Sequence, residues 1–515
     1  MKFFNTAGPI KTDIHYYLDL LERINYNDIK FLIEQEKYFI LHAPRQTGKT
    51  SCLIGLRDYL NTEGKYHCIY FNVEEGQTAR HDVERGVRTI LGALAQQIRF
   101  SHPKLVEKFP DYFSLYDKIP GDKLLGEVLN RFSMNLDKPL ILMIDEIDAL
   151  VGDTLISVLR QLRSGYLNRP KGFPQSIILC GVRDVQDYRI HSDKEKMIIA
   201  GGSAFNIKAK SITLENFQKE EIKKLYLKHT EETGQIFEDD VIDYVWELTE
   251  GQPWLVNALA YEVAFEIEKD RSKPITKEHI ESAKENMILR RDTHIDILID
   301  KLSEARVQKV IEPILYSEEE TENLSIDDLK YVADLGLIKK EEKKYRISNA
   351  IYKEVIPREL VYATQYTMSI EPVWFIENNK LQLDKLLKRF QQFYRENSEV
   401  WLEKFAYKEA GPHLLLMAFL QRIINGGGRI HREYGLGRKR IDLFIEFGGE
   451  KFCIETKVFR TEKSKQDGLS QLKKYMDVCG AKAGHLILFD KSSEKKWDEK
   501  IFFQKFNEYV SIWGM

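Results

Sequence analysis

The segment from Tyr38 to Thr50 constrains the fold more than any other, because it joins an apolar strand to a helix through a short Gly-Lys-Thr loop. The residues YFILHA predict a buried strand, PRQTG predicts a tight loop, and we expect the helix to begin at Lys49. Ala43 stands where such loops usually have their first glycine, which eases the turn without taking part in chemistry. Strand, loop and helix in this order predict one βα unit of a parallel α/β sheet.

The loop is typical of a phosphate site, because backbone N–H groups and the positive end of a helix dipole point at its centre. We expect Lys49 to reach the β- and γ-phosphates of ATP, and Thr50 to ligate Mg²⁺. The residues expected to contact the nucleotide here are Ala43, Gln46, Thr47, Gly48, Lys49 and Thr50.

A second apolar strand, Pro139 to Glu146, ends in two acids. Asp145 at the strand tip is expected in the Mg²⁺ shell, and Glu146 is expected to polarise a water against the γ-phosphate. A buried strand that simply runs into an acidic loop is the alternative, and the upstream phosphate loop favours the site. Asp148 fits either this site or the cap of the next helix.

Two more segments, Tyr66 to Val73 and Ser176 to Val182, read as strands that alternate with helical stretches. This alternation predicts a doubly wound parallel sheet with its ligand at the carboxyl ends of the strands. Arg183 follows the fourth strand at that edge, where it would sense the γ-phosphate. Pairing of Arg183 with Asp184 or Asp187 on the surface is the alternative.

After Leu214 the pattern becomes helical, and Gly251 and Pro253 mark the start of an apolar helix. This arrangement resembles the helical lid of archaeal-type and signal-transducing AAA-like P-loop ATPases, over about residues 1–290. The resemblance implies that Pro253 contacts adenine, whereas an ordinary proline at the first position of a helix is equally compatible. Three arginines stay open as candidates for an arginine finger: Arg160, Arg163 and Arg189.

Residues 291–365 follow the order helix, glycine stop at Gly336, strand, tight turn, strand and helix, which looks like a winged helix. The helix that would enter DNA carries three acids and one base, namely Asp327, Asp328, Asp334 and Lys330. Phosphates would repel such a face, so we expect a packing or regulatory module.

A candidate metal site lies in the C-terminal part of the chain. In FCIETKV, strand alternation places Glu455 and Lys457 on the same face. Asp442 opens the preceding strand, RIDLFIEF, and a turn at Gly448 and Gly449 would bring the two strands together. The two carboxylates would supply hard oxygens to Mg²⁺, and the lysine would orient the attacking water or stabilise charge on a phosphate. A structural hairpin with alternating charges is the alternative.

The order of elements over residues 400–515 resembles the PD-(D/E)XK nuclease superfamily, in the form found fused to AAA-like ATPases. The resemblance implies that this trio is catalytic, although the Pro-Asp of the superfamily is Ile-Asp here. Gln471 and Tyr475 match the Gln-x-x-x-Tyr pattern on the following helix, for which an ordinary polar helix face is the alternative. Glu409 is a candidate additional acid from the first helix. Glycine-hinged basic residues beside the trio favour contacts with a phosphate backbone over a solvated loop: Arg429, Arg432, Arg438, Lys439 and Arg440.

The composition limits where a nucleic acid could bind. The sequence has 77 lysines and arginines against 80 acids, so any basic surface must be local. The five scattered cysteines predict reduced thiols, and the longest apolar run, Leu414 to Leu420, is too short to cross a bilayer. We expect a soluble cytoplasmic protein.

Together these observations predict a multidomain α/β protein that is an ATP-dependent or ATP-gated, metal-dependent nuclease, in defence or mobile-element biology. The expected parts are a P-loop ATPase core at 1–215, a helical lid at 216–290, a winged-helix-like module at 291–365, a helical linker at 366–399 and a nuclease-like domain at 400–515. ATP and Mg²⁺ are the expected cofactors and nucleic acid, DNA rather than RNA, the expected partner, with a homo-oligomer left open. The alternatives are an ATP-binding switch that binds nucleic acid or a protein without cleavage, and a motor that remodels DNA.

Overall fold

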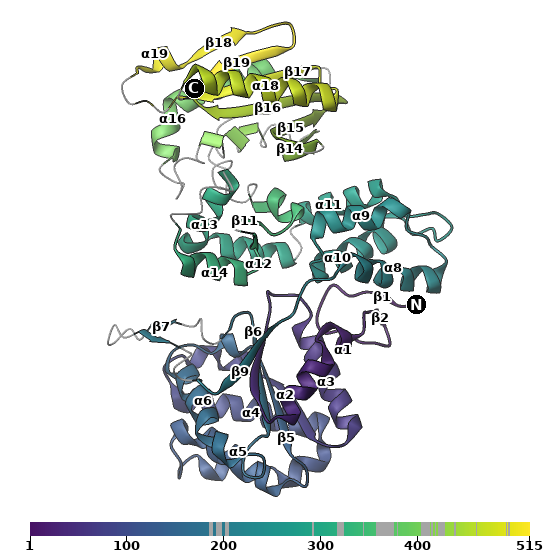
Figure 1. Cartoon of the computed structure of the whole chain (residues 1–515), viewed down its shortest axis with the longest axis vertical. Helices are drawn as coiled ribbons and strands as arrows, with labels where there is room; N and C mark the ends of the chain where they lie inside the picture. The colour runs from purple at the N-terminus through teal and green to yellow at the C-terminus, as the bar shows by residue number, and fades with distance from the viewer. Residues whose placement is uncertain are drawn as a thin grey trace. The chain divides into compact units, whose positions relative to one another are not determined.

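The computed structural model divides into two compact units, each described by itself below (Figure 1). The first comprises Met1–Asn286 with Asp334–Gly336, and the second comprises Met287–Ala333 with Leu337–Met515. The structure describes residues 1–184, 189–191, 198–200, 205–290, 293–316, 324–342, 344–356, 375–377, 380–402, 412–413, 416–417, 419–420, 428–436, 439–459, 461–490, 492 and 495–515.

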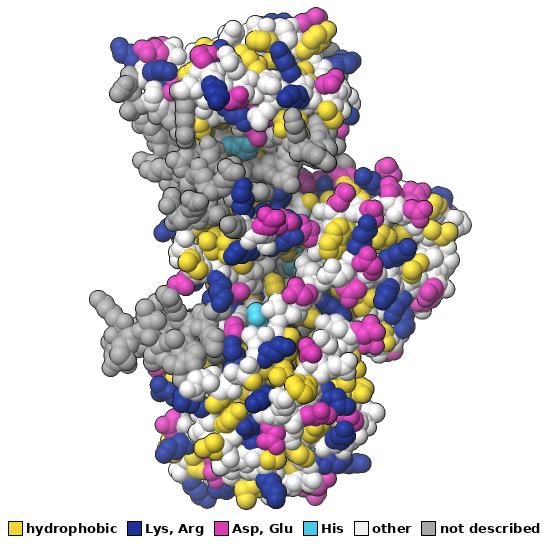
Figure 2. All heavy atoms as spheres, in the orientation of Figure 1, with side chains coloured by type: hydrophobic (Ala, Val, Ile, Leu, Met, Phe, Trp, Pro, Cys, Tyr) yellow, Lys and Arg dark blue, Asp and Glu magenta, His cyan; other side chains and the backbone are white. Residues whose placement is uncertain are grey.

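The surface of both units mixes charges of the two signs. Acidic and basic side chains are interspersed on the visible face of each unit (Figure 2). The same balance holds for the whole sequence, whose formal net charge is −3. Within the described residues, no helix is both long enough and apolar enough to cross a membrane.

A five-stranded parallel sheet forms the centre of the first unit, in the order β4-β5-β6-β3-β9. Its strands are β3 (Tyr38–His42), β4 (His67–Asn72), β5 (Leu140–Asp145), β6 (Ser176–Gly181) and β9 (Lys208–Thr213). The sheet confirms the predicted parallel α/β core. The prediction lacks β9, because its residues KAKSIT are polar and mostly exposed at the sheet edge and so carry no apolar run.

Helices cover both faces of this sheet (Figure 1). One face carries α2 (Tyr26–Glu34) and α3 (Lys49–Glu63), and the other carries α4 (Val83–Ser101), α5 (Gly121–Asn135) and α6 (Gly152–Ser164). Successive strand residues alternate between the two cores, as the pleat of a strand requires. Tyr70 and Phe71 of β4, for example, belong to opposite cores.

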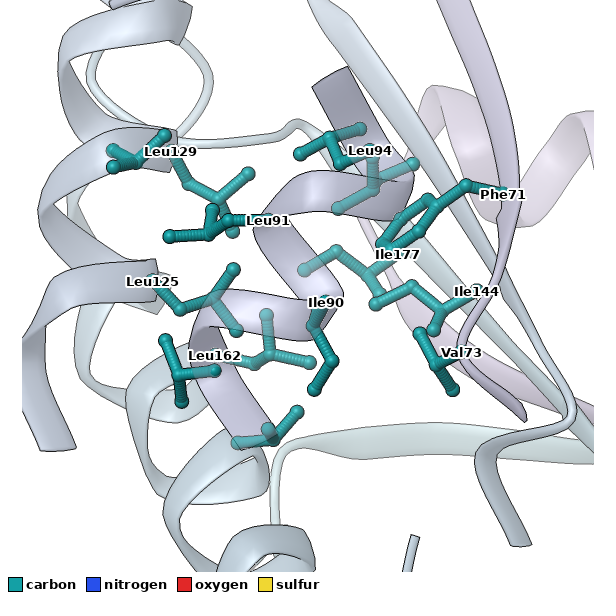
Figure 3. Packing of buried hydrophobic residues seen from close by; sticks show 14 of the residues in the cluster. Phe71, Val73, Ile90, Leu91, Leu94, Leu125, Leu129, Ile144, Leu162 and Ile177 are labelled. Carbon is teal, nitrogen blue, oxygen red and sulfur yellow. The ribbon is translucent and has the colours of Figure 1, made fainter. Parts of the chain in front are cut away.

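The larger core fixes the carboxyl ends of the strands in place. In it, α4 lies between α5 and the sheet, as the close view of the packing shows (Figure 3). Leu91 and Leu94 of α4 are completely buried, and full burial of each such side chain contributes roughly 1.5–3 kcal/mol. The packed core therefore holds the strand ends that carry the predicted acids in fixed positions.

A helical bundle completes the first unit. It consists of α8 (Lys219–Thr233), α9 (Asp239–Thr249), α10 (Pro253–Tyr261), the π-helical η7 (Glu262–Ile267) and α11 (Lys277–Arg290). The N-terminal segment packs on this bundle, since the rings of Phe4 and Tyr226 lie 5.5 Å apart. The short elements of the unit are β1 (Phe3–Phe4), β2 (His15–Tyr16), α1 (Leu20–Arg23), η1 (Glu74–Ala79), η2 (Pro103–Lys108), η3 (Phe113–Leu115), η4 (Ile147–Ala149), η5 (Gly165–Asn168), β7 (Arg189–His191) and β8 (Ile198–Ala200).

The second unit begins with helices and a hairpin. These are α12 (Thr293–Leu302), α13 (Ala305–Tyr316), α14 (Ile326–Asp334), β10 (Ile338–Glu341) and β11 (Lys344–Ile347). Gly336 follows α14 with a φ of +80°, a conformation that glycine adopts without strain. The two strands pair antiparallel, and the winged-helix interpretation of this region stays a prediction.

A six-stranded mixed sheet forms the rest of the second unit, in the order β14-β15-β16-β17-β19-β18. Its strands are β14 (Gly428–Leu436), β15 (Lys439–Phe447), β16 (Glu450–Val458), β17 (Ala483–Phe489), β18 (Phe502–Lys505) and β19 (Val510–Gly514). Helix α18 (Glu462–Cys479) lies along one face of the sheet (Figure 1). On the other face, Tyr394 of α16 (Leu383–Leu402) packs against Phe489 with ring centroids 5.4 Å apart. The remaining short elements are β12 (Ile376–Glu377), β13 (Lys380–Leu381) and α19 (Trp497–Lys500).

The basic residues predicted beside the trio lie in strands where the structure describes them, and their contact with a phosphate backbone stays a prediction. Arg429 and Arg432 lie in β14, and Lys439 and Arg440 open β15, where Gly435 pairs with Arg440. Alternating apolar residues such as Ile430 and Tyr434 make the first segment a strand rather than a loop. Arg438 and Glu409 lie outside the described residues, as do Gly426, Gly427 and Gly437.

Candidate functional site

The predicted phosphate loop connects β3 to α3 as expected, and α3 begins at Lys49. Gly48 precedes the helix with a φ of +95°, and Gln46 has a φ of +58°. These left-handed conformations turn the chain sharply enough for successive backbone N–H groups to face one point. Lys49 is buried, and its Nζ donates to the carbonyl oxygens of Ala43 and Pro44 at 2.8 Å each. The ammonium group therefore lies within the loop that would hold the phosphates.

Asp145 accepts three hydrogen bonds that connect the parts of this site. Its carboxylate is completely shielded from solvent and accepts hydrogen bonds from Thr50 Oγ1 at 2.7 Å and from the Tyr70 hydroxyl at 2.9 Å. The backbone N–H of Glu146 donates to its other oxygen at 2.9 Å. The structure thus joins Thr50 and Asp145, the two residues expected to hold Mg²⁺. Tyr70 is absent from the prediction, because only the pairing of β4 with β5 brings it there.

Two more acids follow Asp145. Burial raises the pKa of Glu146, and repulsion by Asp148 and Asp145 raises it further. Asp148 Oδ1 is buried and has no hydrogen-bond partner within the part of the chain that the structure describes. A side chain at Gly181 would come within 2.7 Å of that oxygen, so the glycine allows Asp148 to approach the tip of β6. The carboxylate of Asp148 therefore lies next to the end of β6. The sequence alone did not decide between this site and a helix cap for Asp148.

Arg23 is a second residue that the sequence did not reveal. Its guanidinium donates to the Thr47 carbonyl at 3.0 Å and to the Glu215 carbonyl at 2.6 Å. It also stacks on the ring of Phe217, 4.5 Å from the ring centre. These contacts connect the phosphate loop to the segment that enters the helical bundle. No local pattern marks Arg23, because its partners lie far away in the sequence.

Pro253 is buried at the first position of α10, and Gln252 caps that helix through the N–H of Leu255. The preceding Gly251 accepts a hydrogen bond from the N–H of Phe217 at 2.9 Å. The turn with Pro253 thus lies beside the ring on which Arg23 stacks, in the same unit as the phosphate loop. Both interpretations of Pro253, adenine contact and helix start, are compatible with this position.

Arg183 stands past the end of β6, as predicted, and one of its contacts is with a residue that the sequence did not suggest. Its Nε donates to Asp334 at 3.2 Å, and Asp334 belongs to the first unit. Asp184 binds Lys208 Nζ at 2.5 Å, and Asp187 lies outside the described residues. Of the candidate finger residues, Arg160 and Arg163 are exposed on α6, and the side chain of Arg189 is not described.

A model of the AAA-like domain family matches residues 6–357, which is more than half of the chain. The chain belongs to the AAA-like domain family. Membership supports ATP binding and ATPase activity for this part of the protein, and P-loop ATPases typically bind nucleotide with Mg²⁺. No curated protein matches the chain.

Several solved structures resemble the AAA-like domain. A Walker-type ATPase of Pyrococcus abyssi is 17% identical, with a TM-score of 0.48, and the match covers 68% of this chain and 99% of that one. Cdc6p of Pyrobaculum aerophilum is 14% identical, with a TM-score of 0.37, over 66% of this chain and 93% of that one. The Orc1 protein of Aeropyrum pernix, solved in complex with DNA, is 14% identical, with a TM-score of 0.35, over 68% of this chain and 95% of that one.

The C-terminal trio lies beyond the AAA-like match, on β15 and β16. These strands turn at Gly448 and Gly449, whose φ angles of +56° and +79° suit a two-residue hairpin. The pairing runs to Leu443 opposite Ile454, so the next position in the same register sets Asp442 opposite Glu455. Asp442 and Glu455 therefore lie side by side at one end of the hairpin.

Glu455 is buried, with 2% of its side chain exposed, and Lys457 Nζ lies 2.8 Å from its Oε1. Its Oε2 has no hydrogen-bond partner among the residues described. Burial raises the pKa of Glu455 to about 8, and the neighbouring Asp442 adds to the rise. Burial lowers the pKa of Lys457, but the carboxylates of Glu455 and Asp442 outweigh that effect and raise it overall. The lysine is therefore an ammonium ion at neutral pH, whereas Glu455 is largely protonated there and would ionise on binding a cation.

Asp442 is held by groups that the prediction did not include. Its Oδ2 accepts hydrogen bonds from the backbone N–H and the hydroxyl of Thr456, both at 2.8 Å. The same hydroxyl lies 3.1 Å from Nδ1 of His413. His413 comes from a helical segment far away in the sequence, so only the fold reveals this contact.

The two α18 residues that the resemblance implied differ in their surroundings. Tyr475 is buried in the core between α18 and the sheet and contributes to the high pKa of Lys457. Gln471 is exposed, and in the described part of the chain no hydrogen bond joins it to the trio. Its catalytic role stays a prediction.

The carboxylates of Asp442 and Glu455 provide only part of the ligands that a hard cation such as Mg²⁺ requires. Within the described residues, no group of three or more His, Cys, Asp or Glu side chains is arranged to hold a metal ion. Asp442 and Glu455 provide two carboxylates, and Mg²⁺ commonly takes one or two carboxylates while water and substrate phosphate fill the rest. The unpartnered oxygen of Glu455 is what a ligand at this place would satisfy.

Proposed function

We propose that the protein is an ATP-gated, metal-dependent nuclease. Its AAA-like domain would bind and hydrolyse ATP, and its second unit would cleave phosphodiester bonds at Asp442, Glu455 and Lys457. The observation that carries the proposal is the buried Glu455, whose free oxygen lies beside a second carboxylate and a charged lysine. A buried carboxylate oxygen without a partner costs free energy, so it is favoured where a ligand completes it.

Each residue of the trio has a distinct task in this proposal. Asp442 and Glu455 would hold Mg²⁺, which, when bound, supplies Lewis-acid stabilisation of the phosphate and an activated water. Lys457 would neutralise charge that develops on the phosphate, because its ammonium form is stabilised by both carboxylates. Thr456 holds the Asp442 carboxylate in place through two hydrogen bonds, and His413 orients the Thr456 hydroxyl.

The nucleotide site would supply the gate. Lys49 and the loop N–H groups would hold the phosphates, with Thr50 and Asp145 on Mg²⁺. Glu146 would take the proton of the attacking water, and its raised pKa makes it a better base than an exposed carboxylate. ATP binding or hydrolysis would then set the rate at which the second unit cleaves.

Cleavage of end-labelled DNA and RNA, each single-stranded and double-stranded, tests the nuclease with Mg²⁺ or Mn²⁺ present. Glu455→Gln and Lys457→Ala should each reduce the cleavage rate by roughly 100-fold or more, because each removes charge needed in the transition state. Lys451→Ala is the matched control, since Lys451 is an exposed lysine on the same strand. Undiminished cleavage by Lys457→Ala would contradict the site, and ATP hydrolysis without cleavage of any substrate would favour a nucleotide switch.

A further inference from the structure

A row of exposed aromatic rings lies at the edge of the second sheet. Phe502, Phe506 and Tyr509 expose 38%, 42% and 56% of their surface, whereas Phe503, 53% exposed, points to the opposite face of the strand and packs on Trp513. Among the described residues, β18 is the outermost strand and pairs only with β19, and all four of its residues are exposed. Large rings stabilise a protein when they are buried, so a cluster of exposed ones indicates a surface that another molecule covers.

Two lysines of α18 reach these rings from the adjacent helix. Lys473 Nζ lies 4.5 Å from the centre of the Phe506 ring, and Lys465 Nζ lies 5.9 Å from that of Phe502. Lys465 also donates to Gln504 Oε1 at 3.0 Å. Eight residues of helix span about 12 Å, and four residues of extended chain span about 13 Å. The two lysines and two rings therefore form two ammonium–aromatic pairs at matching spacing, here called the aromatic–lysine strip.

The charge of this strip is positive. At the rings this charge comes from Lys465 and Lys473, because Lys505 points to the opposite face of β18. Helix α18 also carries Glu462, Asp467 and Asp477. The nearby Asp498 is bound by Arg395 at 2.8 Å. Figure 2 shows hydrophobic and basic side chains next to one another over α18 and β18. A polyanion that also presents flat apolar faces matches both properties.

Phe502, at one end of the strip, lies in the same cross-strand register as Lys457. The pairing register runs from Lys457 to Leu488, then to Gly514, and then to Phe502. Three strand spacings separate Lys457 from Phe502, which is about 14 Å. Both residues face α18, because Gly468 of that helix packs against Lys457 and Lys465 reaches Phe502. One end of the strip thus lies about 14 Å from the trio, with the core beneath α18 between them.

We propose that the aromatic–lysine strip binds single-stranded nucleic acid, with bases stacked on Phe502 and Phe506 and phosphates near Lys465 and Lys473. Base–aromatic stacking tolerates any sequence, and lysines along the backbone add a salt-dependent attraction. The bases of a duplex are stacked on one another and cannot reach the rings. The inference rests on the proposed nuclease function for its placement and names the strand form of the substrate, whereas binding can be measured without cleavage.

Fluorescence anisotropy of a labelled oligothymidylate of roughly 16 nucleotides, with the matching duplex as comparison, tests the strip in the full-length protein. Phe502→Ala/Phe506→Ala should weaken binding of the single strand at least tenfold, and Phe502→Tyr/Phe506→Tyr should restore it, because tyrosine also stacks. Lys465→Gln/Lys473→Gln should lower the slope of log affinity against log salt by about 1.4. Phe100→Ala, which removes an exposed ring on α4, is the matched control.

Three outcomes would overturn the inference. These are no binding of the single strand by the wild type, unchanged binding by Phe502→Ala/Phe506→Ala, and equal affinity for the duplex. Light scattering on the same samples identifies the other occupant, because loss of a dimer in that variant with unchanged binding would make the strip an interface between copies. Cleavage by the wild type separates the two proposals: binding that depends on the strip, without any cleavage by the wild type, would keep the inference and contradict the nuclease.

Discussion

At the scale of single residues, Asp145 shows how one buried carboxylate organises the nucleotide site. It accepts from Thr50, Tyr70 and the backbone of Glu146 while completely buried. A buried carboxylate with several donors has a fixed orientation, because each donor restricts its rotation. Thr50, on the first turn of α3, is therefore held against the tip of β5 before any nucleotide arrives.

Tyr70→Phe tests this role. The variant removes one hydrogen bond to a charged group and leaves the ring, so the free energy of unfolding should fall by about 1.5 kcal/mol. Because Asp145 then loses one of its three restraints, kcat for ATP hydrolysis should fall by roughly tenfold. Steady-state hydrolysis and urea denaturation measure both effects, with Tyr66→Phe, just before the same strand, as the control. Wild-type kcat in Tyr70→Phe would show that the hydroxyl only fills space.

The residues found from the sequence and those missed differ in one physical respect. Lys49, Thr50 and Asp145 stand in local patterns, a loop between strand and helix and the end of an apolar strand, so spacing alone places them. Arg23 and His413 act on groups that are distant in the sequence, and only the folded chain brings them there. No sequence pattern of this kind encodes such long-range partners.

At the scale of elements, the second sheet contains a buried histidine that should make the protein sensitive to acid. His485 of β17 is 3% exposed, and burial lowers its pKa to about 4. Its Nδ1 accepts a hydrogen bond from Trp513 Nε1 at 3.2 Å, which requires the neutral ring. Asp384 lies 3.6 Å away, but its side chain is 67% exposed, so solvent screens its charge.

The sign of the pH effect follows from the lowered pKa. Below about 6.5 the unfolded chain binds a proton at this histidine and the folded chain does not, so stability falls as the pH drops toward 4. The slope from one such group is at most about 1.4 kcal/mol per pH unit. His485→Asn should therefore flatten the pH dependence of the free energy of unfolding between pH 6.5 and 4, measured by urea denaturation. An unchanged slope in His485→Asn would show that this histidine is not the titrating group.

The elements that the sequence predicted are those with clear apolar periods. Strands β3, β4, β5 and β6 are buried apolar runs and were predicted within one or two residues. The edge strands β9 and β18 are largely exposed, so their formation depends on a neighbouring strand rather than on their own pattern. The prediction therefore lacks one edge of the first sheet and both edges of the second, and with β18 the aromatic–lysine strip.

At the scale of the whole molecule, the chain combines an AAA-like domain with a second sheet that the family match does not reach. The match ends at residue 357, while the Asp442, Glu455 and Lys457 trio lies on β15 and β16. The nucleotide site and the trio thus occur in one chain, and the trio is proposed to hold a divalent cation. We propose that the nucleotide site controls the trio.

The most direct test is the cleavage rate of single-stranded DNA with Mg²⁺, measured with and without ATP in wild type and in Lys49→Ala. Lys65→Ala, at an exposed lysine in the same unit, is the matched control. We expect ATP to change the cleavage rates of the wild type and of Lys65→Ala several-fold. Lys49→Ala should cleave at the same rate with and without ATP, because it cannot bind the phosphates of ATP. Cleavage by the wild type at the same rate with and without ATP would contradict the account.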